Sequence, residues 1–190
     1  MKDGATIINH LYELVETECK SPNNRFGYGI WSHHIVQVIK YSKLLAKEID
    51  ADIELVEIAA LLHDYSGIRY YSLHEQHQIH SSIDAEEILR RFNYSGEKIK
   101  IIKEAILSHR GSIKAEVKSR EARCLINADA MSHIDQVVSL LYYVFNKENM
   151  SIEDGKKWVR KKLNRSWDKM DDIGRKIMEE KYKVITSLLE

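Results

Sequence analysis

The scarcity of helix-breaking residues constrains the fold of this chain more than any other feature. Its 190 residues include one proline, Pro22, and eight glycines. Apolar residues recur at intervals of three and four residues almost everywhere, which is the pattern of helices that bury one face. No repeat or low-complexity run divides the chain. We therefore expect an all-helical fold that forms a single domain over residues 1–190.

The apolar pattern and the turn residues predict where the helices lie. Residues 21–29 are rich in turn formers, and residues 64–80, which hold several tyrosines and histidines, are predicted to form a loop over a functional site. Ser95 is predicted to cap the helix that follows it. The helices are expected at residues 5–19, 31–48, 53–63, 82–92, 95–110, 118–146, 151–164 and 166–189. The last two form a C-terminal pair over residues 151–189, for which we predict a packing role.

Composition argues against several classes of partner. The chain has 29 basic and 29 acidic residues, so no net charge attracts nucleic acid or anionic lipid. No stretch approaches 18 consecutive apolar residues, and no membrane span or targeting segment is expected. Cys19 and Cys124 match no zinc-binding spacing, which favours a reduced, cytoplasmic setting. The basic run within residues 156–165 is predicted to be a solvated helix face.

The adjacent residues His63 and Asp64 indicate function most directly. They stand where a nearly all-apolar segment, residues 53–62, ends. A helix turns by about 100° per residue, which places His63 on the apolar side of its helix. Where the helix stops, Asp64 can turn its carboxylate toward the same point. Burying an imidazole beside a carboxylate is costly unless something pairs with both, so a metal ion is the economical explanation.

Three further groups fall on inward helix faces by the same angular test. They are His34, His109 and Asp129, whereas His33 points outward. An unpaired carboxylate at Asp129 would protonate in an apolar stripe, and a cation removes that cost. His133, one turn further on, can orient Asp129 or act as another ligand. A single inward histidine is more often an ordinary core residue, but several together favour a metal site.

One more histidine ligand is expected from the segment 64–80. His80 is our first choice, and His74 and His77 are alternatives in the same stretch. Capture of phosphate oxygens would need cations, and the nearest in sequence are Arg110, Arg69 and Lys114. Basic side chains such as these are mostly exposed.

These residues resemble the signature of the HD superfamily of metal-dependent phosphohydrolases, which is a His, then His-Asp at a helix end, then a distant Asp. The similarity extends over about residues 31–145, which would form the HD core. The similar blocks are the segment from His34 through Val38 and Ala46, the run Glu57-Ile-Ala-Ala-Leu-Leu-His63-Asp64, and Asn127-Ala-Asp129-Ala.

The resemblance implies an HD-type helical bundle in which His34, His63, Asp64 and Asp129 bind one metal ion. Members with two ions add two histidines, and the blocks around His80 and His109 are similar to theirs, with Asp64 bridging. The chain departs from many relatives after His-Asp, where it has Tyr65-Ser66-Gly67 in place of Gly-Lys, so no lysine stands there for the phosphate contact. It also lacks the Gly-Tyr-Pro block of cyclic-dinucleotide phosphodiesterases.

Imidazole and carboxylate ligands without a thiolate suit manganese, iron, nickel, cobalt or zinc, as one or two ions. Such an ion binds a phosphoryl oxygen and lowers the pKa of a coordinated water. We therefore expect a phosphohydrolase that cleaves a phosphoester or phosphoanhydride of a small molecule, foremost a nucleotide or dinucleotide. Asp64 and Arg110 are the residues expected to act in catalysis.

Two other functions remain open at this point. A di-iron oxygenase of the HD type would need both His80 and His109 as ligands. A non-catalytic helical module could retain metal or nucleotide as a structural element. Tyr65, Tyr70 and Tyr71 offer rings that could stack on a base. No nucleic-acid or membrane partner is expected, and a homodimer is only the commonest default for the assembly.

Overall fold

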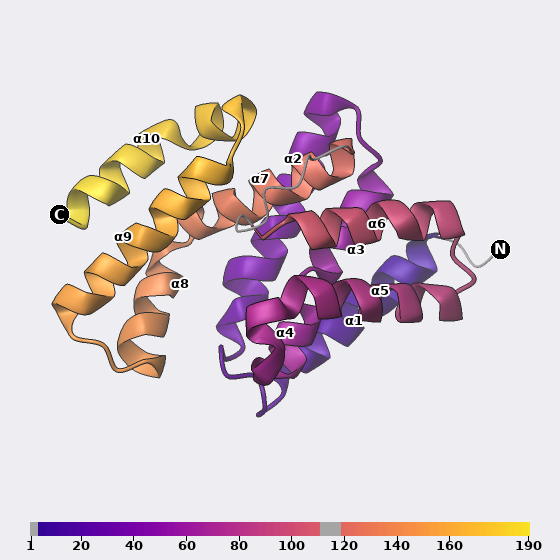
Figure 1. Cartoon of the computed structure of the whole chain (residues 1–190), viewed down its shortest axis with the longest axis horizontal. Helices are drawn as coiled ribbons and strands as arrows, with labels where there is room; N and C mark the ends of the chain where they lie inside the picture. Colours follow the sequence, from indigo (N-terminus) through magenta and orange to yellow (C-terminus); the bar gives the residue numbers. More distant parts are fainter. Residues whose placement is uncertain (1–3, 111–118) are drawn as a thin grey trace.

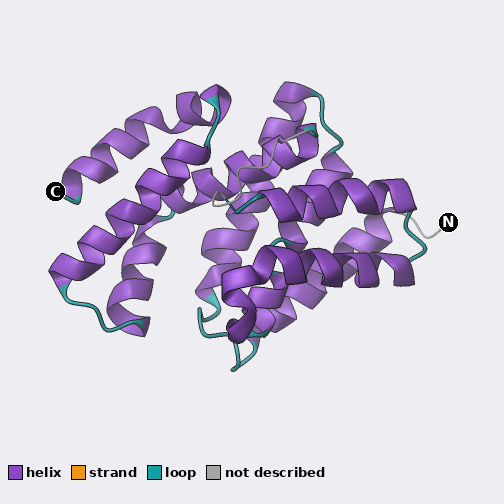
Figure 2. Ribbon diagram, in the orientation of Figure 1, coloured by secondary structure: helices purple, strands orange, loops and turns teal. Residues whose placement is uncertain are grey.

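The computed structural model describes residues 4–110 and 119–190. In these residues it consists of helices and short connections without a strand (Figures 1 and 2), which confirms the all-helical prediction. The helices are α1 (Gly4–Lys20), η1 (Trp31–Ile35), α2 (Val36–Ile49), α3 (Ile53–Leu62), α4 (Tyr65–Arg69), η2 (Tyr71–Gln76), α5 (His77–Arg91), α6 (Gly96–Ser108), α7 (Arg120–Asp135), α8 (Val137–Tyr142), η3 (Tyr143–Lys147), α9 (Ile152–Lys169) and α10 (Asp172–Leu188). None of the described helices combines the length and the apolar character that a membrane span requires.

Helix α3 lies in the middle of the bundle, because it is apolar on nearly every side. All residues from Leu55 to Leu62 are buried, and the helix packs against α1, α2, α6 and α7. The buried carboxylate of Glu57 accepts hydrogen bonds from Tyr12 Oη at 2.9 Å and Lys43 Nζ at 2.8 Å. Asp52 begins the helix by accepting hydrogen bonds from two backbone amides of its first turn. The end of α3, and with it His63, therefore lies deep in the protein.

The segment 64–80 is not a loop, so that prediction was wrong. It forms α4 and η2 and the first turn of α5, which begins five residues before the predicted start. Tyr65 and Ile68 are buried in the core, and this burial stabilises a helix too short to show an apolar period. Gly67 lets α4 lie against α5, since a Cβ at this position would be 3.1 Å from the Cβ of His77.

Two other predicted boundaries and one predicted cap differ from the structure. The long helix expected over 118–146 is divided at Gln136, whose φ of −111° and ψ of 39° interrupt the helix, and residue 118 lies outside the described residues. The break expected at residue 165 occurs instead at Met170, because Asp171 caps α10 by accepting hydrogen bonds from Ile173 N and Gly174 N. Ser95 occupies the cap position of α6, but its side chain makes no capping hydrogen bond.

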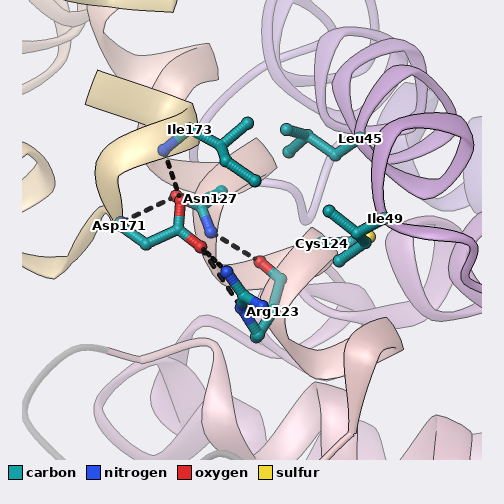
Figure 3. A pocket seen from close by; sticks show the side chains of 7 residues that line it. All are labelled: Leu45, Ile49, Arg123, Cys124, Asn127, Asp171 and Ile173. Atoms are coloured by element: carbon teal, nitrogen blue, oxygen red, sulfur yellow. Dashed lines mark hydrogen bonds and ion pairs between the residues drawn. The ribbon is translucent and has the colours of Figure 1, made fainter. Parts of the chain in front are cut away.

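The C-terminal pair, α9 and α10, packs on α7. Figure 3 shows one part of this contact, where Asp171 accepts a hydrogen bond from Arg123 at 2.7 Å. Asn127 is buried beside it, donates to the carbonyl of Arg123 at 2.8 Å and accepts from the amide of Asp171 at 3.0 Å. These bonds fix the connection between α9 and α10 against the middle of α7, and so determine which side of α9 faces the bundle.

Replacing Gly174 with alanine should lower the free energy of unfolding by about 1–3 kcal/mol. The added Cβ would lie 2.4 Å from Asn127 Oδ1, which cannot move without losing its bond to the amide of Asp171. Gly96→Ala is the matched control, because nothing lies within 4 Å of its added Cβ. Urea unfolding checks both variants, and equal stability of the two would contradict this account of the α7–α10 contact.

Candidate metal centre

Seven side chains from five parts of the fold meet in one group, which we call the His-Asp cluster. Each comes from a place where a helix ends, begins or faces the core. His34 lies in η1, His63 and Asp64 follow α3, His77 begins α5, His109 follows α6, and Asp129 and His133 lie one turn apart in α7. Three subsets each bring their ligand atoms within 4.8 Å of one another: His34, His63 and Asp64; His34, Asp129 and His133; Asp64, His77 and His109.

The carboxylate of Asp64 lies between two pairs of imidazoles. Its Oδ2 is 3.2 Å from His34 Nε2 and 3.4 Å from His63 Nε2. Its Oδ1 is 3.1 Å from His77 Nε2 and 3.7 Å from His109 Nε2. Each carboxylate oxygen therefore faces one pair, which is the arrangement of a bridging ligand.

Asp129 lies on the other side of His34. Its Oδ1 is 3.5 Å from His34 Nε2 and 3.7 Å from His133 Nε2. Its Oδ2 accepts a hydrogen bond from Lys169 Nζ, and the same ammonium donates to the backbone carbonyl of His109 at 3.1 Å. Burial would raise the pKa of Asp129, but Lys169 and the histidines hold it well below its usual range. The carboxylate that was expected to need a cation thus has one from α9 and remains charged.

Backbone contacts fix the protonation of three of the imidazoles. The Nδ1 atom lies close to the backbone carbonyl oxygen three residues earlier in His63, His77 and His109, at 2.7, 2.7 and 2.6 Å. A carbonyl oxygen only accepts, so Nδ1 carries the proton in each ring. The Nε2 atom of each neutral ring is then a lone-pair donor to a cation, and it points into the cluster.

His34 reaches the same state through a serine. Ser132 Oγ donates to the carbonyl of Asp129 at 2.8 Å and lies 2.9 Å from His34 Nδ1. Because the serine proton is used on the carbonyl, its oxygen accepts from His34 Nδ1. His34 Nε2 is therefore also unprotonated in the neutral ring and directed at Asp64 and Asp129.

These neutral tautomers leave acceptor atoms facing one another. His34 Nε2 and His63 Nε2 are 3.1 Å apart, and His77 Nε2 and His109 Nε2 are 2.9 Å apart. Neutral rings with Nδ1 protonated cannot hydrogen-bond through these atoms, and the carboxylate between them accepts as well. Only protons or metal ions can satisfy so many converging lone pairs, so the donor set fits divalent cations.

The pKa values of the cluster show how protons compete for these lone pairs. Burial acts to lower the pKa of His63 and His77, but the charge of Asp64 outweighs it and raises both. The same histidines hold the pKa of Asp64 well below its usual range against the effect of burial. Burial dominates at His109, where it lowers the pKa to about 4. Without a metal, protons therefore collect on His63 and His77.

Metal affinity should fall as the pH is lowered, beginning above 6.5, the ordinary histidine value. A metal binds the unprotonated ring, so raised pKa values at His63 and His77 make protons compete from that higher pH downward. His109, with a pKa of about 4, should not contribute in this range. Titration of the metal-free protein with manganese at about pH 8 and about pH 6 measures the change, and equal affinity at both would contradict the protonation described here.

The structure brings together five of the six metal ligands predicted from the sequence: His34, His63, Asp64, His109 and Asp129. His80 does not join any of the three subsets, and His77 occupies the expected place. This corrects the choice among the three histidines of the segment 64–80. Because α5 begins at His77, His80 lies almost a full turn further along the helix and is partly exposed.

Two of the predicted cations lie near carboxylates that do not belong to the cluster. The Arg110 guanidinium pairs with Glu75 at 2.9 Å, and Arg69 lies 3.6 Å from Glu18. Neither belongs to the His-Asp cluster, so a catalytic role for Arg110 remains a prediction. Lys114 lies outside the described residues.

Sequence reasoning missed the contribution of α9. Four members of its basic run are exposed as predicted, namely Lys157, Arg160, Lys161 and Arg165. Lys162, however, is partly buried, and burial lowers its pKa to about 8 although Asp129 opposes the shift. Ser166 Oγ lies 3.2 Å from His133 Nδ1, and Lys169 contacts Asp129. In the sequence, the one indication of this contact is that Lys162, Ser166 and Lys169 lie beside the buried positions Val159, Leu163 and Met170.

A profile of the HD domain matches residues 31–134 of the chain. An uncharacterised protein from Clostridium beijerinckii is 31% identical over 104 residues, which cover 53% of this chain and 63% of that protein. The match therefore spans less than two thirds of that relative's length.

Solved structures with the same fold include the Lin1889 protein from Listeria innocua, with a TM-score of 0.72, 20% identity, and 98% and 93% of the two chains covered. A predicted HD superfamily hydrolase from an uncultured Thermotogales bacterium has a TM-score of 0.65 and 19% identity, with 95% and 88% covered. A protein from Lactobacillus plantarum has a TM-score of 0.72 and 17% identity, with 97% and 93% covered. At these identities the likeness shows the fold, which extends over α9 and α10.

Proposed function

We propose that this chain, which belongs to the HD domain family, is a metal-dependent phosphohydrolase acting on a small phosphate compound. The observation that carries the proposal is the convergence of four imidazole Nε2 atoms on the two oxygens of Asp64. A divalent cation bound there would offset the charge of a phosphoryl group and lower the pKa of a bound water.

The donor set divides into two groups that share Asp64. His34, His63 and Asp64 would hold one ion, and His77, His109 and Asp64 would hold another. Asp129 Oδ1, 3.5 Å from His34 Nε2, would be a further ligand to the first ion. The abundance of imidazole favours manganese, iron, cobalt, nickel or zinc over magnesium. The Nδ1 bonds to backbone carbonyls orient His63, His77 and His109 in advance, which favours tight binding.

Aromatic side chains beside His77 support a nucleotide as the substrate. The ring of Tyr71 stacks on His74 with centroids 5.5 Å apart, and His74 stacks on His77 at the same distance. Phe26 lies 5.2 Å from His74, and these rings are partly exposed. A base could stack on this group while its phosphates reach the cluster. Of the three tyrosines considered from the sequence, Tyr65 is buried, and Tyr71 is the one that stacks on His74, so Tyr71 suits this role best.

A phosphate-release assay tests the proposal. Purified protein would be stripped of metal, loaded in turn with manganese, cobalt and nickel, and assayed against a panel of mononucleotides and dinucleotides. Elemental analysis of the same samples gives the number of ions per chain. Absence of turnover on every compound with metal bound would overturn the hydrolase and favour a non-catalytic binding module.

A di-iron oxygenase is the second candidate, because Asp64 between two pairs of imidazoles also suits two irons. In this function His77, in place of the predicted His80, would be the iron ligand that acts together with His109. Iron as the native metal, with oxygen consumption and no phosphate release, would select this function over hydrolysis.

A further inference from the structure

Helix α9 turns one face toward the His-Asp cluster. Lys162, Ser166 and Lys169 are spaced by four and three residues, so they lie on the same side of the helix. Lys169 contacts Asp129 and the carbonyl of His109, and Ser166 lies beside His133. Figure 1 shows α9 running past α7, which carries Asp129 and His133. Lys162, one turn before Ser166, therefore lies on the face of α9 that borders the cluster.

Lys162 has no hydrogen bond or ion pair with any other residue in the described ranges 4–110 and 119–190. A partly buried lysine normally has a partner, because burying an ammonium without one is costly. The charges that act on it are those of Asp129 and Asp64, opposed by Lys169 and Arg165. With a pKa of about 8, the side chain is still mostly charged at neutral pH. It is thus a cation beside the cluster with its hydrogen-bond donors unused.

Two other cations considered for phosphate binding, Arg69 and Arg110, lie near carboxylates outside the cluster. No lysine follows His63-Asp64, Arg69 lies near Glu18, and Arg110 pairs with Glu75. Lys169 already donates to two oxygens. Of Arg69, Arg110, Lys162 and Lys169, only Lys162 combines a position beside the cluster with donors that have no partner among the described residues.

We propose that Lys162 binds a non-bridging phosphate oxygen of the substrate, so that α9 supplies the phosphate-binding cation missing after His63-Asp64. The inference rests on the proposed function for the class of ligand. It makes α9, which lies outside the matched residues 31–134, a part of the binding site. Inorganic pyrophosphate carries the same chemical groups and serves as the probe.

The test compares pyrophosphate binding to the manganese-loaded full chain by calorimetry. Lys162→Met should weaken binding by about tenfold or more, the loss expected for a charge-assisted hydrogen bond. Lys162→Arg should restore most of the affinity because it keeps a cationic donor. Lys161→Met is the matched control, since this neighbouring lysine is exposed and its loss changes the net charge equally. Manganese content should be the same in all four proteins.

Several results would overturn the inference. They are equal binding by Lys162→Met and Lys161→Met, loss of manganese from Lys162→Met, and absence of pyrophosphate binding by the unaltered protein. The proposed function can fail separately. If the unaltered protein hydrolyses no nucleotide but still binds pyrophosphate through Lys162, hydrolysis is excluded and the phosphate site stands.

Discussion

Replacing Asp64 with asparagine should lower phosphohydrolase activity by at least about a thousandfold and reduce the metal content of the protein. The two oxygens of Asp64 face both pairs of imidazoles, at 3.1 to 3.7 Å. An amide keeps the shape but loses the charge, and its nitrogen cannot coordinate a cation. Both groups of ligands should therefore be weakened by one substitution.

Asp50→Asn is the matched control for this variant. Asp50 is exposed, and its φ of 54° is one that asparagine adopts readily. Activity and metal content should be unchanged there. Circular dichroism should show a helical fold in both variants, because Asp64 is not a hydrophobic core residue. Full activity of folded Asp64→Asn would overturn the metal-dependent mechanism.

Replacing His77 with alanine should remove the ion held by His77, His109 and Asp64, while His80→Ala should leave it in place. His77 Nε2 lies 2.9 Å from His109 Nε2 and 3.1 Å from Asp64 Oδ1, so its loss leaves two of three ligands. A lost ligand typically weakens metal binding severely, and activity should fall by about a hundredfold or more.

Elemental analysis distinguishes the possible results for these two histidines. Two ions per chain in the unaltered protein and in His80→Ala, with one in His77→Ala, is the expected outcome. If His80→Ala loses an ion and His77→Ala keeps both, the ligand is His80 and the assignment of His77 as the ligand is wrong. One ion in all three proteins would confine the site to His34, His63, Asp64 and Asp129.

Most of the cluster could be predicted because it lies on long helices or at their ends. In a helix with several apolar turns, the periodic positions determine which side is buried, and that side carried His34, His109 and Asp129. Burial of the end of α3 followed from its almost uniform apolar composition. The prediction failed for residues 64–80, because α4 and η2 are too short to show an apolar periodicity. The sequence therefore predicted neither the start of α5 at His77 nor which histidine joins the cluster.

The local sequence determined the helical class, the buried sides of the long helices and most of the residues that meet in the His-Asp cluster, because these depend on neighbours within a few turns. The position of α9 against α7, with Ser166 beside His133 and Lys169 beside Asp129, became known from the three-dimensional structure alone. That placement depends on contacts between residues far apart in sequence, such as Asp171 with Arg123 and Asn127. Helical periodicity carries no information about which helix a given face meets.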